Sequence, residues 1–289
     1  MQPNNRFTGL DLEFWANVKL LNQRLGYAER RTQANPNPGF IIPTKEQIID
    51  VFEGEGLNPS KLVANHTVMP LGVLVQEYME YRSDALMNYV KPNLMDQKSA
   101  SELFESKREE LSPLCPLPMN KQKGDKRRPA FLTGLVNMHI EAHKGEFDCD
   151  YNPKELTSLT SNNYPIRTMS RRVDGAFPSV KDPIAVWEIK EYYYTTTFGS
   201  RVADGVYETQ LDGWELREAR ENLGQDVKHY LIVDDYFTWW HLGRSYLCRL
   251  IDSMHMNLVS EVIFGKEVVS RIPVLVNHWK SLIIKSERE

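Results

Sequence analysis

The chain has 289 residues, of which 41% are hydrophobic and 26% charged, and its formal net charge is −4. These values are typical of a globular protein with one or two domains, and no apolar run is long enough to cross a bilayer. The slightly acidic balance excludes a protein that is basic throughout, although a local basic surface would suffice for a single DNA-binding cleft.

The N-terminus and the cysteines indicate the cellular compartment. The opening residues, MQPNNRFTGLDLEF, lack the basic and apolar segments of a secretory signal. Cys115, Cys149 and Cys248 are odd in number and far apart, which favours reduced thiols over a disulfide framework. We therefore expect a cytoplasmic protein without a membrane partner.

Residues 1–115 are predicted to be mostly helical. Apolar residues at helical spacing predict a first helix in LDLEFWANVKLLNQRL, and Thr44 is placed to cap a second in TKEQIIDVFEGEGL. Ser60 could cap a third helix, giving a helix-turn-helix, although such pairs occur in any helical domain. Further helices are expected over 71–90 and through Glu110.

The segment LSPLCPLPMNKQKGDKRRP is rich in proline and basic residues and has no periodicity. It predicts a basic linker over 116–128, between a helical N-terminal domain (1–115) and a C-terminal domain (129–289). The C-terminal domain is predicted to contain, in order, a helix, two strands, a helix, a strand, a helix and a strand. This order is typical of a mixed α/β domain with a central sheet. The predicted segments are 131–143, 171–177, 184–194, 201–222, 229–233, 241–256 and 259–264.

An acidic residue followed two positions later by lysine occurs four times, but in only one case within a predicted strand. In IAVWEIKEYY the period-two alternation places Glu188 and Lys190 on one face, and Trp187 and Ile189 on the other. The other three pairs lie in polar helical sequence or in the approach to a strand: Asp96–Lys98, Glu105–Lys107 and Asp226–Lys228.

The preceding strand, RRVDGAF, supplies a second carboxylate. If the connection PSVKDP forms a hairpin turn centred on Lys181, Asp174 lies directly opposite Glu188, with Cβ atoms about 5 Å apart. Two facing carboxylates repel each other unless a cation or proton lies between them. Alternatively, Asp174 begins a turn, and Glu188 and Lys190 form a surface pair on an edge strand.

Two carboxylates and a lysine at one point are suited to phosphodiester hydrolysis. Mg²⁺ binds one or two carboxylates together with water and substrate phosphate, activates a bound water and stabilises the charge that develops on the phosphate. A neighbouring lysine can orient the attacking water or neutralise the transition state. The pattern therefore indicates a Mg²⁺-dependent nuclease.

Asp174-Gly175, the following gap and Glu188-Ile189-Lys190 resemble the PD-(D/E)xK nuclease superfamily, which includes type II restriction endonucleases. The resemblance covers about residues 129–265, and Val173 stands where the motif's name has proline. It implies an αβββαβ core within the α/β (α+β, mixed-sheet) fold, Mg²⁺ bound by Asp174 and Glu188, and a catalytic site of Asp174, Glu188 and Lys190.

The resemblance also nominates further residues. Members often carry a glutamate in the helix before the hairpin, where this chain has Glu141, and a glutamine or tyrosine in the helix after it, where Gln210 and Tyr207 are candidates. Glu141 could equally face solvent. Basic and polar residues that flank the proposed site become candidate DNA contacts: Lys126, Arg127, Arg128, Arg171, Arg172, Ser200, Arg201 and Gln210.

Three alternatives remain open at this point. His139, Glu141, His143 and Cys149 could form a transition-metal site, although the spacing differs from that of zinc proteases. The chain could also be a non-catalytic DNA-binding protein with a nuclease-like core, or a repair or recombination nuclease. The long N-terminal domain favours a sequence-specific type II restriction enzyme that cleaves double-stranded DNA as a homodimer.

Overall fold

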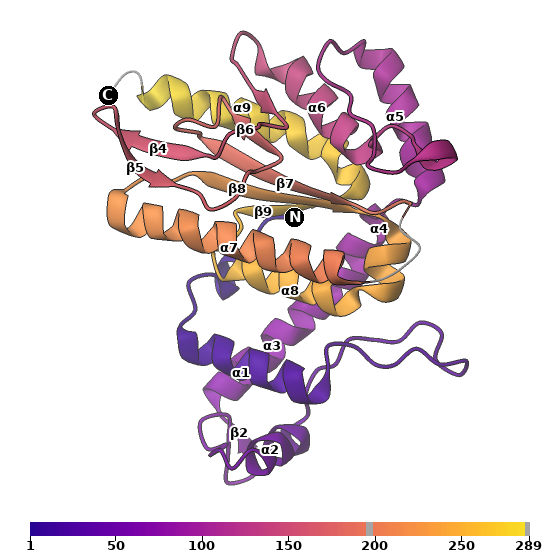
Figure 1. The fold of residues 1–289 in the computed structure, drawn as a ribbon. Coiled ribbons are helices and arrows are strands. Elements are labelled where there is room, and N and C mark those ends of the chain that lie inside the picture. The colour runs from indigo at the N-terminus through magenta and orange to yellow at the C-terminus, as the bar shows by residue number, and fades with distance from the viewer. Residues whose placement is uncertain (195–198, 287–289) are drawn as a thin grey trace.

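A five-stranded mixed sheet forms the centre of the C-terminal part of the chain (Figure 1). The computed structural model describes residues 1–194 and 199–286. In this part of the chain β3 pairs antiparallel with β6 and β6 with β7, whereas β7, β8 and β9 are parallel. The strands are β3 (Asp150–Tyr151), β6 (Gly175–Phe177), β7 (Ala185–Glu191), β8 (Lys228–Asp234) and β9 (Glu261–Phe264), with a separate hairpin of β4 (Ser158–Ser161) and β5 (Tyr164–Thr168).

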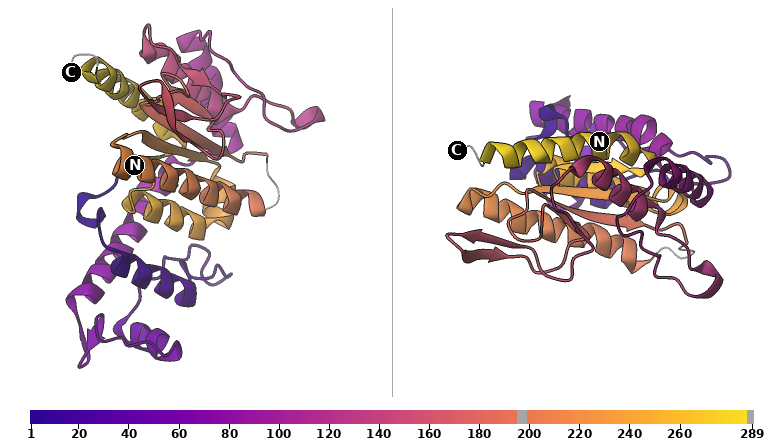
Figure 2. Two further views of the ribbon diagram at one scale, coloured as in Figure 1. Left: turned by 60° about the vertical axis from the view of Figure 1, so that its left-hand side comes forward. Right: turned by 90° about the horizontal axis from the view of Figure 1, so that it is seen from above.

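Helices cover both faces of the sheet. α6 and α9 pack on one face with α5 beside α6, and α7 and α8 cover the other face, as Figures 1 and 2 show. The fold is therefore mixed α/β, in agreement with the predicted class. The helices are α5 (Gln97–Leu111), α6 (Phe131–Lys144), α7 (Ser200–Leu223), α8 (Arg244–His255) and α9 (Val268–Ser286), with short helical turns η3 (Gly124–Lys126), η4 (Phe237–Leu242) and η5 (Gly265–Glu267).

Alternation along β7 divides its side chains between the two helical layers. Trp187 stacks on Trp279 of α9, with ring centroids 5.7 Å apart, and Ile189 packs against the same core. Val186 packs on the opposite side with residues of α7, and Glu188 follows it on that face. Both parts of the predicted alternation are thus confirmed, because the period-two pattern leaves only one way to bury two large apolar side chains.

The register of the β6–β7 hairpin is the one predicted from the sequence. Gly175 pairs with Trp187, and the Asp174 backbone N–H donates to the Trp187 carbonyl at 3.1 Å. Asp174 therefore stands opposite Glu188 immediately before β6. A glycine is needed after Asp174 because the indole of Trp187 lies over it: a Cβ built there would fall 2.2 Å from the ring.

We expect Gly175→Ala to destabilise the protein by about 1–3 kcal/mol, because the added methyl group forces the Trp187 indole or the hairpin backbone to move. Gly54→Ala is the matched control, since a Cβ at Gly54 meets no atom within 4 Å. Urea unfolding of the two variants measures the difference. Equal free energies of unfolding for the two variants would contradict the close packing at Gly175.

The N-terminal part forms a smaller helical unit with its own apolar core. Thr44 caps α2 through a reciprocal capping box, as predicted. Within the described residues no helix begins at Ser60; the short β1–β2 hairpin takes its place, so the predicted helix-turn-helix is wrong. The elements of this unit are η1 (Asn5–Phe7), α1 (Leu12–Leu25), α2 (Lys45–Gly54), β1 (Val63–Ala64), β2 (Thr67–Val68) and α3 (Pro70–Ala85), which continues through η2 (Leu86–Val90) and α4 (Lys91–Asn93).

The packing divides the chain earlier than the predicted boundary at residue 115. Phe104 of α5 contacts Phe131 of α6, and Ala100 and Phe104 belong to the core beneath the sheet. The predicted linker, 116–128, consequently joins two neighbouring helices of one layer, and the Asn137 side chain of α6 holds its start by donating to the Pro116 carbonyl at 2.8 Å. The difference arises because a loop between packed helices has the same composition as a linker between domains.

Two further features bear on the sequence-based expectations. The three cysteines are free, in agreement with the expected thiols. Across residues 1–194 and 199–286, no helix combines the length and the apolar character that a membrane crossing requires.

Candidate active site

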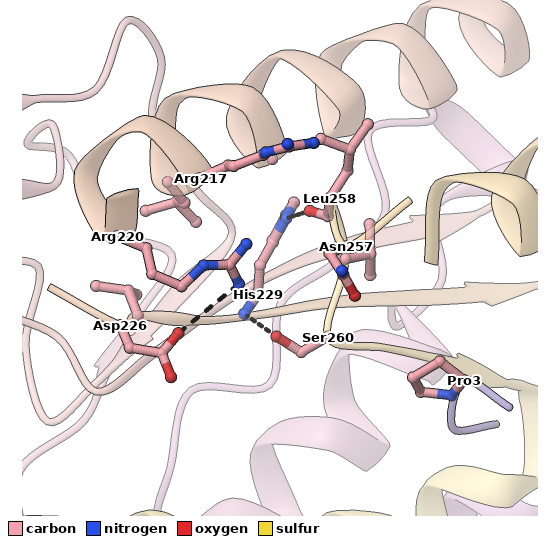
Figure 3. A pocket seen from close by; sticks show the side chains of 12 residues that line it. Pro3, Arg217, Arg220, Asp226, His229, Asn257, Leu258 and Ser260 are labelled. Carbon is pink, nitrogen blue, oxygen red and sulfur yellow. Dashed lines mark hydrogen bonds and ion pairs between the residues drawn. The ribbon is translucent and has the colours of Figure 1, made fainter. Parts of the chain in front are cut away.

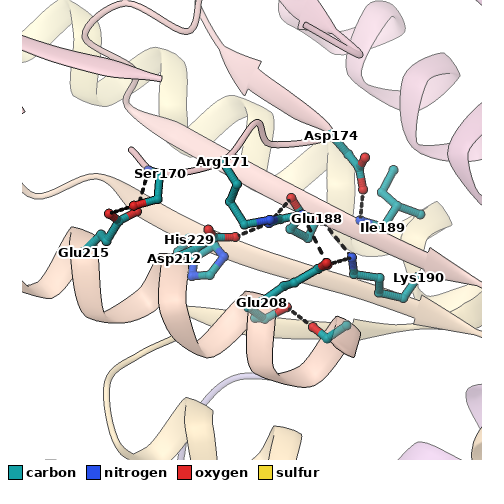
Figure 4. A network of polar contacts seen from close by, with 12 residues as sticks. Ser170, Arg171, Asp174, Glu188, Ile189, Lys190, Glu208, Asp212, Glu215 and His229 are labelled. Atoms are coloured by element: carbon teal, nitrogen blue, oxygen red, sulfur yellow. Dashed lines mark hydrogen bonds and ion pairs between the residues drawn. The ribbon is translucent and has the colours of Figure 1, made fainter. Parts of the chain in front are cut away.

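Asp174, Glu188 and Lys190 come together where β6 and β7 face α7 (Figure 4). The Ile189 backbone N–H donates to Asp174 Oδ2 at 2.8 Å, which fixes the Asp174 carboxylate against the neighbouring strand. Lys190 Nζ lies 3.1 Å from Glu188 Oε2. The hairpin thus brings the three predicted catalytic residues to one place, with Glu188 almost wholly buried.

Helix α7 and the loop before β6 complete the site with three more charged groups. Glu208 Oε2 accepts from Lys190 Nζ at 2.9 Å. Arg171 donates to Glu188 Oε1 at 2.8 Å and to Asp212 Oδ2 at 2.5 Å, and its other terminal nitrogen lies 3.3 Å from Glu208. Glu208 and Asp212 are four residues apart and so share the face of α7 that lies over the sheet.

The surroundings shift the pKa values of the acids in opposite directions. Burial, reinforced by the Glu188 carboxylate, raises the pKa of Asp174 to about 6. Burial also acts on Glu188, but Lys190 and Arg171 outweigh it and lower the pKa of Glu188. Burial raises the pKa of Asp212 to about 7 even though Arg171 opposes the shift. One acid of the facing pair is therefore held ionised while the other gains a proton easily.

We expect Asp174→Asn to stabilise the metal-free protein at neutral pH. The folded state favours protonated Asp174, because its pKa is about 6 in the fold and 3.8 for an ordinary aspartate. That preference adds stability at pH below about 4 and is lost as the pH rises through about 6. Above that pH the wild type carries a penalty of about 3 kcal/mol that asparagine lacks. Urea unfolding in EDTA at about pH 4 and about pH 7 tests this; a variant effect that is the same at both would contradict it.

Four carboxylates surround two cations at the site. Glu188 Oε2 contacts Lys190 at ion-pair distance but lacks a well-directed hydrogen bond, and the fully buried Asp212 Oδ1 has no hydrogen-bond partner among the described residues. The excess of acidic groups over Arg171 and Lys190 leaves negative charge that a bound cation would neutralise.

Asp174 and Glu188 fit the way in which proteins hold Mg²⁺. In the described part of the chain, no three His, Cys, Asp or Glu side chains converge as a ready-made metal cage. Here Arg171 and Lys190 lie among the acids and Asp174 turns one oxygen to the backbone. Mg²⁺, however, is usually bound by only one or two carboxylates, with water and substrate phosphate supplying the rest. The facing acids and the incompletely satisfied oxygen of Glu188 meet that requirement.

The structure does not bring Glu141 or Gln210 into this cluster. Glu141 accepts hydrogen bonds from the backbone N–H groups of Leu114 and Cys115, at 2.7 and 2.8 Å, and so holds the chain that leaves α5. Gln210 donates to Ser253 Oγ of α8 at 2.9 Å. The contacts of both residues join neighbouring segments, because the rotation of a helix about its axis decides which side chain reaches the sheet.

The other residue proposed on α7, Tyr207, points its hydroxyl to Arg249, whose Nη1 lies 3.1 Å away. It therefore contacts α8 instead of the acidic cluster.

The predicted DNA contacts fall into three groups. Arg171 is a member of the acidic cluster, where it is bound to carboxylates. Ser200 and Arg201 are exposed at the start of α7, and Tyr192 donates to the Arg201 carbonyl at 3.1 Å. The remaining ones are exposed residues of loops, Arg127, Arg128 and Arg172, together with Lys126, whose side chain lies outside the described part of the structure.

Sequence reasoning missed Glu208, Asp212 and Gly205. A Cβ at Gly205 would lie 3.2 Å from the Lys190 side chain, so the small residue lets Lys190 pass beneath α7. The available signal was the spacing of Gly205, Glu208 and Asp212 on one face of a predicted helix that follows the acid-x-Lys strand.

The alternative transition-metal site is not assembled in the described residues. His139 is buried on α6, and burial lowers its pKa to about 4. Its ring stacks on that of His143, with centroids 6.4 Å apart, and His143 Nδ1 bonds to the His139 carbonyl at 2.8 Å. The two histidines therefore contact each other along α6.

Comparisons with known proteins define the family. Residues 95–279 match the family described as "Domain of unknown function (DUF7687)", and residues 1–89 match "Domain of unknown function (DUF7690)". The chain therefore belongs to the DUF7687 family, and the acidic cluster lies inside the matched region. No curated protein and no solved structure matches the chain. Residues 90–94, just before α5, separate the two matched regions, and the core that contains α5 and α6 begins at Met95.

Proposed function

We propose that the protein is a Mg²⁺-dependent endonuclease of the PD-(D/E)xK type. The observation that carries the proposal is the placement of Asp174 directly opposite Glu188, with Lys190 on the same face of β7. Such a convergence of two acids and an ammonium group is unfavourable for folding alone and matches the needs of phosphodiester hydrolysis.

The order of elements around the site supports the same class. α6, β3, β6, β7, α7 and β8 follow one another as helix, three strands, helix and strand, apart from the inserted β4–β5 hairpin. This is the αβββαβ order that the resemblance implies. Asp174 immediately precedes the first strand of the antiparallel hairpin and Glu188 lies on the second, an order that the resemblance also implies.

Each residue of the cluster has a distinct part in the proposed chemistry. Asp174 and Glu188 would hold Mg²⁺, which supplies an activated water and stabilises negative charge on the phosphate. Lys190, kept protonated by Glu188 and Asp174 despite burial, places a positive charge beside the phosphate that is cleaved. Arg171 fixes the Glu188 carboxylate and ties it to α7 through Asp212.

The proposed substrate is double-stranded DNA, cleaved at specific sequences as in type II restriction. A single acidic cluster per chain would cut one strand, so cleavage of both strands calls for a homodimer. The helical N-terminal unit supplies a second surface, beside the core that carries the acids, for target recognition (Figure 2).

Incubation of unmethylated supercoiled plasmid with the full-length chain tests the proposal. We expect discrete fragments with Mg²⁺ and intact plasmid with EDTA. A smear, or cleavage of only single-stranded or branched DNA, would indicate a repair or recombination nuclease. Plasmid that is retarded on a gel but never cut would indicate a non-catalytic DNA-binding protein and contradict the proposal. Sequencing the ends of fragments from a defined genome would then give the recognition sequence.

A further inference from the structure

A second charged site lies between the N-terminal loop, η4 and the start of α8, away from the acidic cluster. The pocket encloses about 680 Å³, its open mouth included. Four of its lining side chains are basic: Arg31, Lys91, His241 and Arg244. Arg30 and Arg31 are adjacent in the sequence, and Arg31 lines the pocket with its Nη1 against His241.

Aromatic rings hold two of these cations, Lys91 and Arg244, in place without neutralising them. The Arg244 guanidinium lies 4.4 Å from the centroid of Phe40 and 4.8 Å from that of Trp240, and Lys91 Nζ lies 5.4 Å from Trp240. Cation–π contacts restrict the side chains and leave the positive charge uncompensated. Arg244 Nε, moreover, is buried without a hydrogen-bond partner in the described residues.

The one acid that lines the pocket is engaged elsewhere. Glu29 Oε2 accepts from the Asn35 side chain at 2.9 Å and from the Gly39 N–H at 3.1 Å, which shapes the loop around it. Within the described residues, Arg31, Lys91 and Arg244 form no ion pair with any carboxylate. Three cationic side chains therefore face one carboxylate that is already bonded.

The lowered pKa of His241 is consistent with a positive electrostatic potential in the pocket. Burial and the charges of Arg31, Lys91 and Arg244 lower its pKa, so its ring is neutral near pH 7. Arg31 Nη1 lies 2.6 Å from His241 Nδ1, and because arginine can only donate, that ring nitrogen accepts.

A pocket at the end of α7 provides the contrast (Figure 3). There Arg220 pairs with Asp226 at 3.9 Å, and Arg217 pairs with Glu221 at 2.7 Å. Each arginine of that pocket has an acidic partner, so its charge is compensated. The pocket beside Trp240 lacks this compensation and is therefore suited to an anion supplied from outside.

We infer that the pocket formed by Arg31, Lys91, His241 and Arg244 binds the phosphate group of a nucleotide, either free or within a DNA strand. Arginine and lysine side chains are the usual ligands of phosphate oxygens, arginine through its planar pair of donors. The pocket is open to solvent and large enough to admit a phosphate group. The inference does not depend on the proposed nuclease activity.

The double variant Arg31→Gln/Lys91→Gln tests the inference in the full chain. Arg31 is exposed and Lys91 is half-buried, and neither replacement removes the contacts of Arg244 with Phe40 and Trp240. Calorimetric titration in EDTA with deoxyadenosine monophosphate, and separately with a short DNA duplex, measures binding. We expect the double variant to lose roughly tenfold or more in affinity for at least one probe. Arg30→Gln removes one positive charge from a neighbouring residue that does not line the pocket, and should change affinity by less than about twofold.

The two probes distinguish the sources of the phosphate. Saturable binding of the mononucleotide that weakens in the double variant assigns the pocket to a free nucleotide. A loss confined to the duplex assigns it to the DNA backbone. The inference is overturned if the wild type binds neither probe, if the double variant binds both as tightly as the wild type, or if Arg30→Gln weakens binding equally.

Discussion

Glu188→Gln is expected to reduce Mg²⁺-dependent DNA cleavage by a factor on the order of a thousand or more. Glutamine keeps the shape of the side chain but removes the charge opposite Asp174, so the proposed metal site loses one of its two carboxylates. Lys190 and Arg171 retain Glu208 and Asp212 as acidic partners, and the variant should therefore remain folded. Initial rates on supercoiled plasmid, with circular dichroism as the check on folding, measure the effect.

The matched control is Asp226→Asn. Asp226 and Lys228 form another acid-x-Lys pair, with Lys228 Nζ 2.5 Å from Asp226 Oδ2, on the approach to β8 and partly exposed. The sequence pattern is the same, but Asp226 pairs with the cations Arg220 and Lys228. We expect the rate of this variant to equal that of the wild type. A folded Glu188→Gln protein that cleaves within about tenfold of the wild-type rate would remove Glu188 from the chemistry.

The largest effect on stability is expected for Arg82, which joins the N-terminal unit to the core. Arg82 of α3 is almost fully buried, and its Nη1 donates to Asp252 of α8 at 2.8 Å. Tyr78 donates to the same carboxylate at 2.6 Å, and Arg82 Nη2 donates to Asn22 of α1 at 2.9 Å. The coulombic attraction of Asp252 outweighs burial and raises the pKa of Arg82, so the guanidinium stays charged. One side chain thus connects three helices across the boundary between the two matched families.

Arg82→Met should lower the free energy of unfolding by about 3–5 kcal/mol, because it leaves the Asp252 carboxylate buried without its counter-ion. Arg6→Met is the control: Arg6 pairs with Glu77 on the surface, where such pairs contribute about 0–1 kcal/mol. The double variant Arg82→Met/Asp252→Leu should recover part of the loss, since it removes both charges together. A loss for Arg82→Met that equals the loss for Arg6→Met, measured by urea unfolding, would refute this role.

The hairpin that carries the candidate site could be predicted because its determinants are local. A turn centred midway between Asp174 and Glu188 sets the register of β6 against β7. The alternation of residues 187–190 decides which side chains of β7 lie on each face of the sheet. Both depend on residues within one turn and two strands, so no knowledge of the remaining fold was required.

The partners contributed by helices could not be predicted in the same way. Glu208 and Asp212 reach the site because the face of α7 that carries them is turned toward β7. On the other side of the sheet, the rotation of α6 about its own axis turns Glu141 toward Leu114. The rotation of a helix on a sheet depends on packing between segments that are distant in sequence. Periodicity identifies the helix but leaves its orientation undetermined.

The β4–β5 hairpin, α9 and β3 were not predicted from the sequence, and the last two were missed for physical reasons of their own. α9 contains Pro273, a residue that normally marks the end of a helix, although here the helix continues on both sides of it. β3 is only two residues long, Asp150–Tyr151, and is held by its pairing with β6. Neither a tolerated proline nor so short a strand leaves a periodic pattern in the sequence.

Binding of Mn²⁺, which stands in for Mg²⁺, to the full-length chain at neutral pH tests the central claim most directly. Electron paramagnetic resonance of free Mn²⁺ should report saturable binding to the wild type, with affinity lowered by about tenfold or more in both Asp174→Asn and Glu188→Gln, and unchanged in Asp226→Asn. Wild-type protein that leaves the metal free, or binding that both site variants retain in full, would contradict the account.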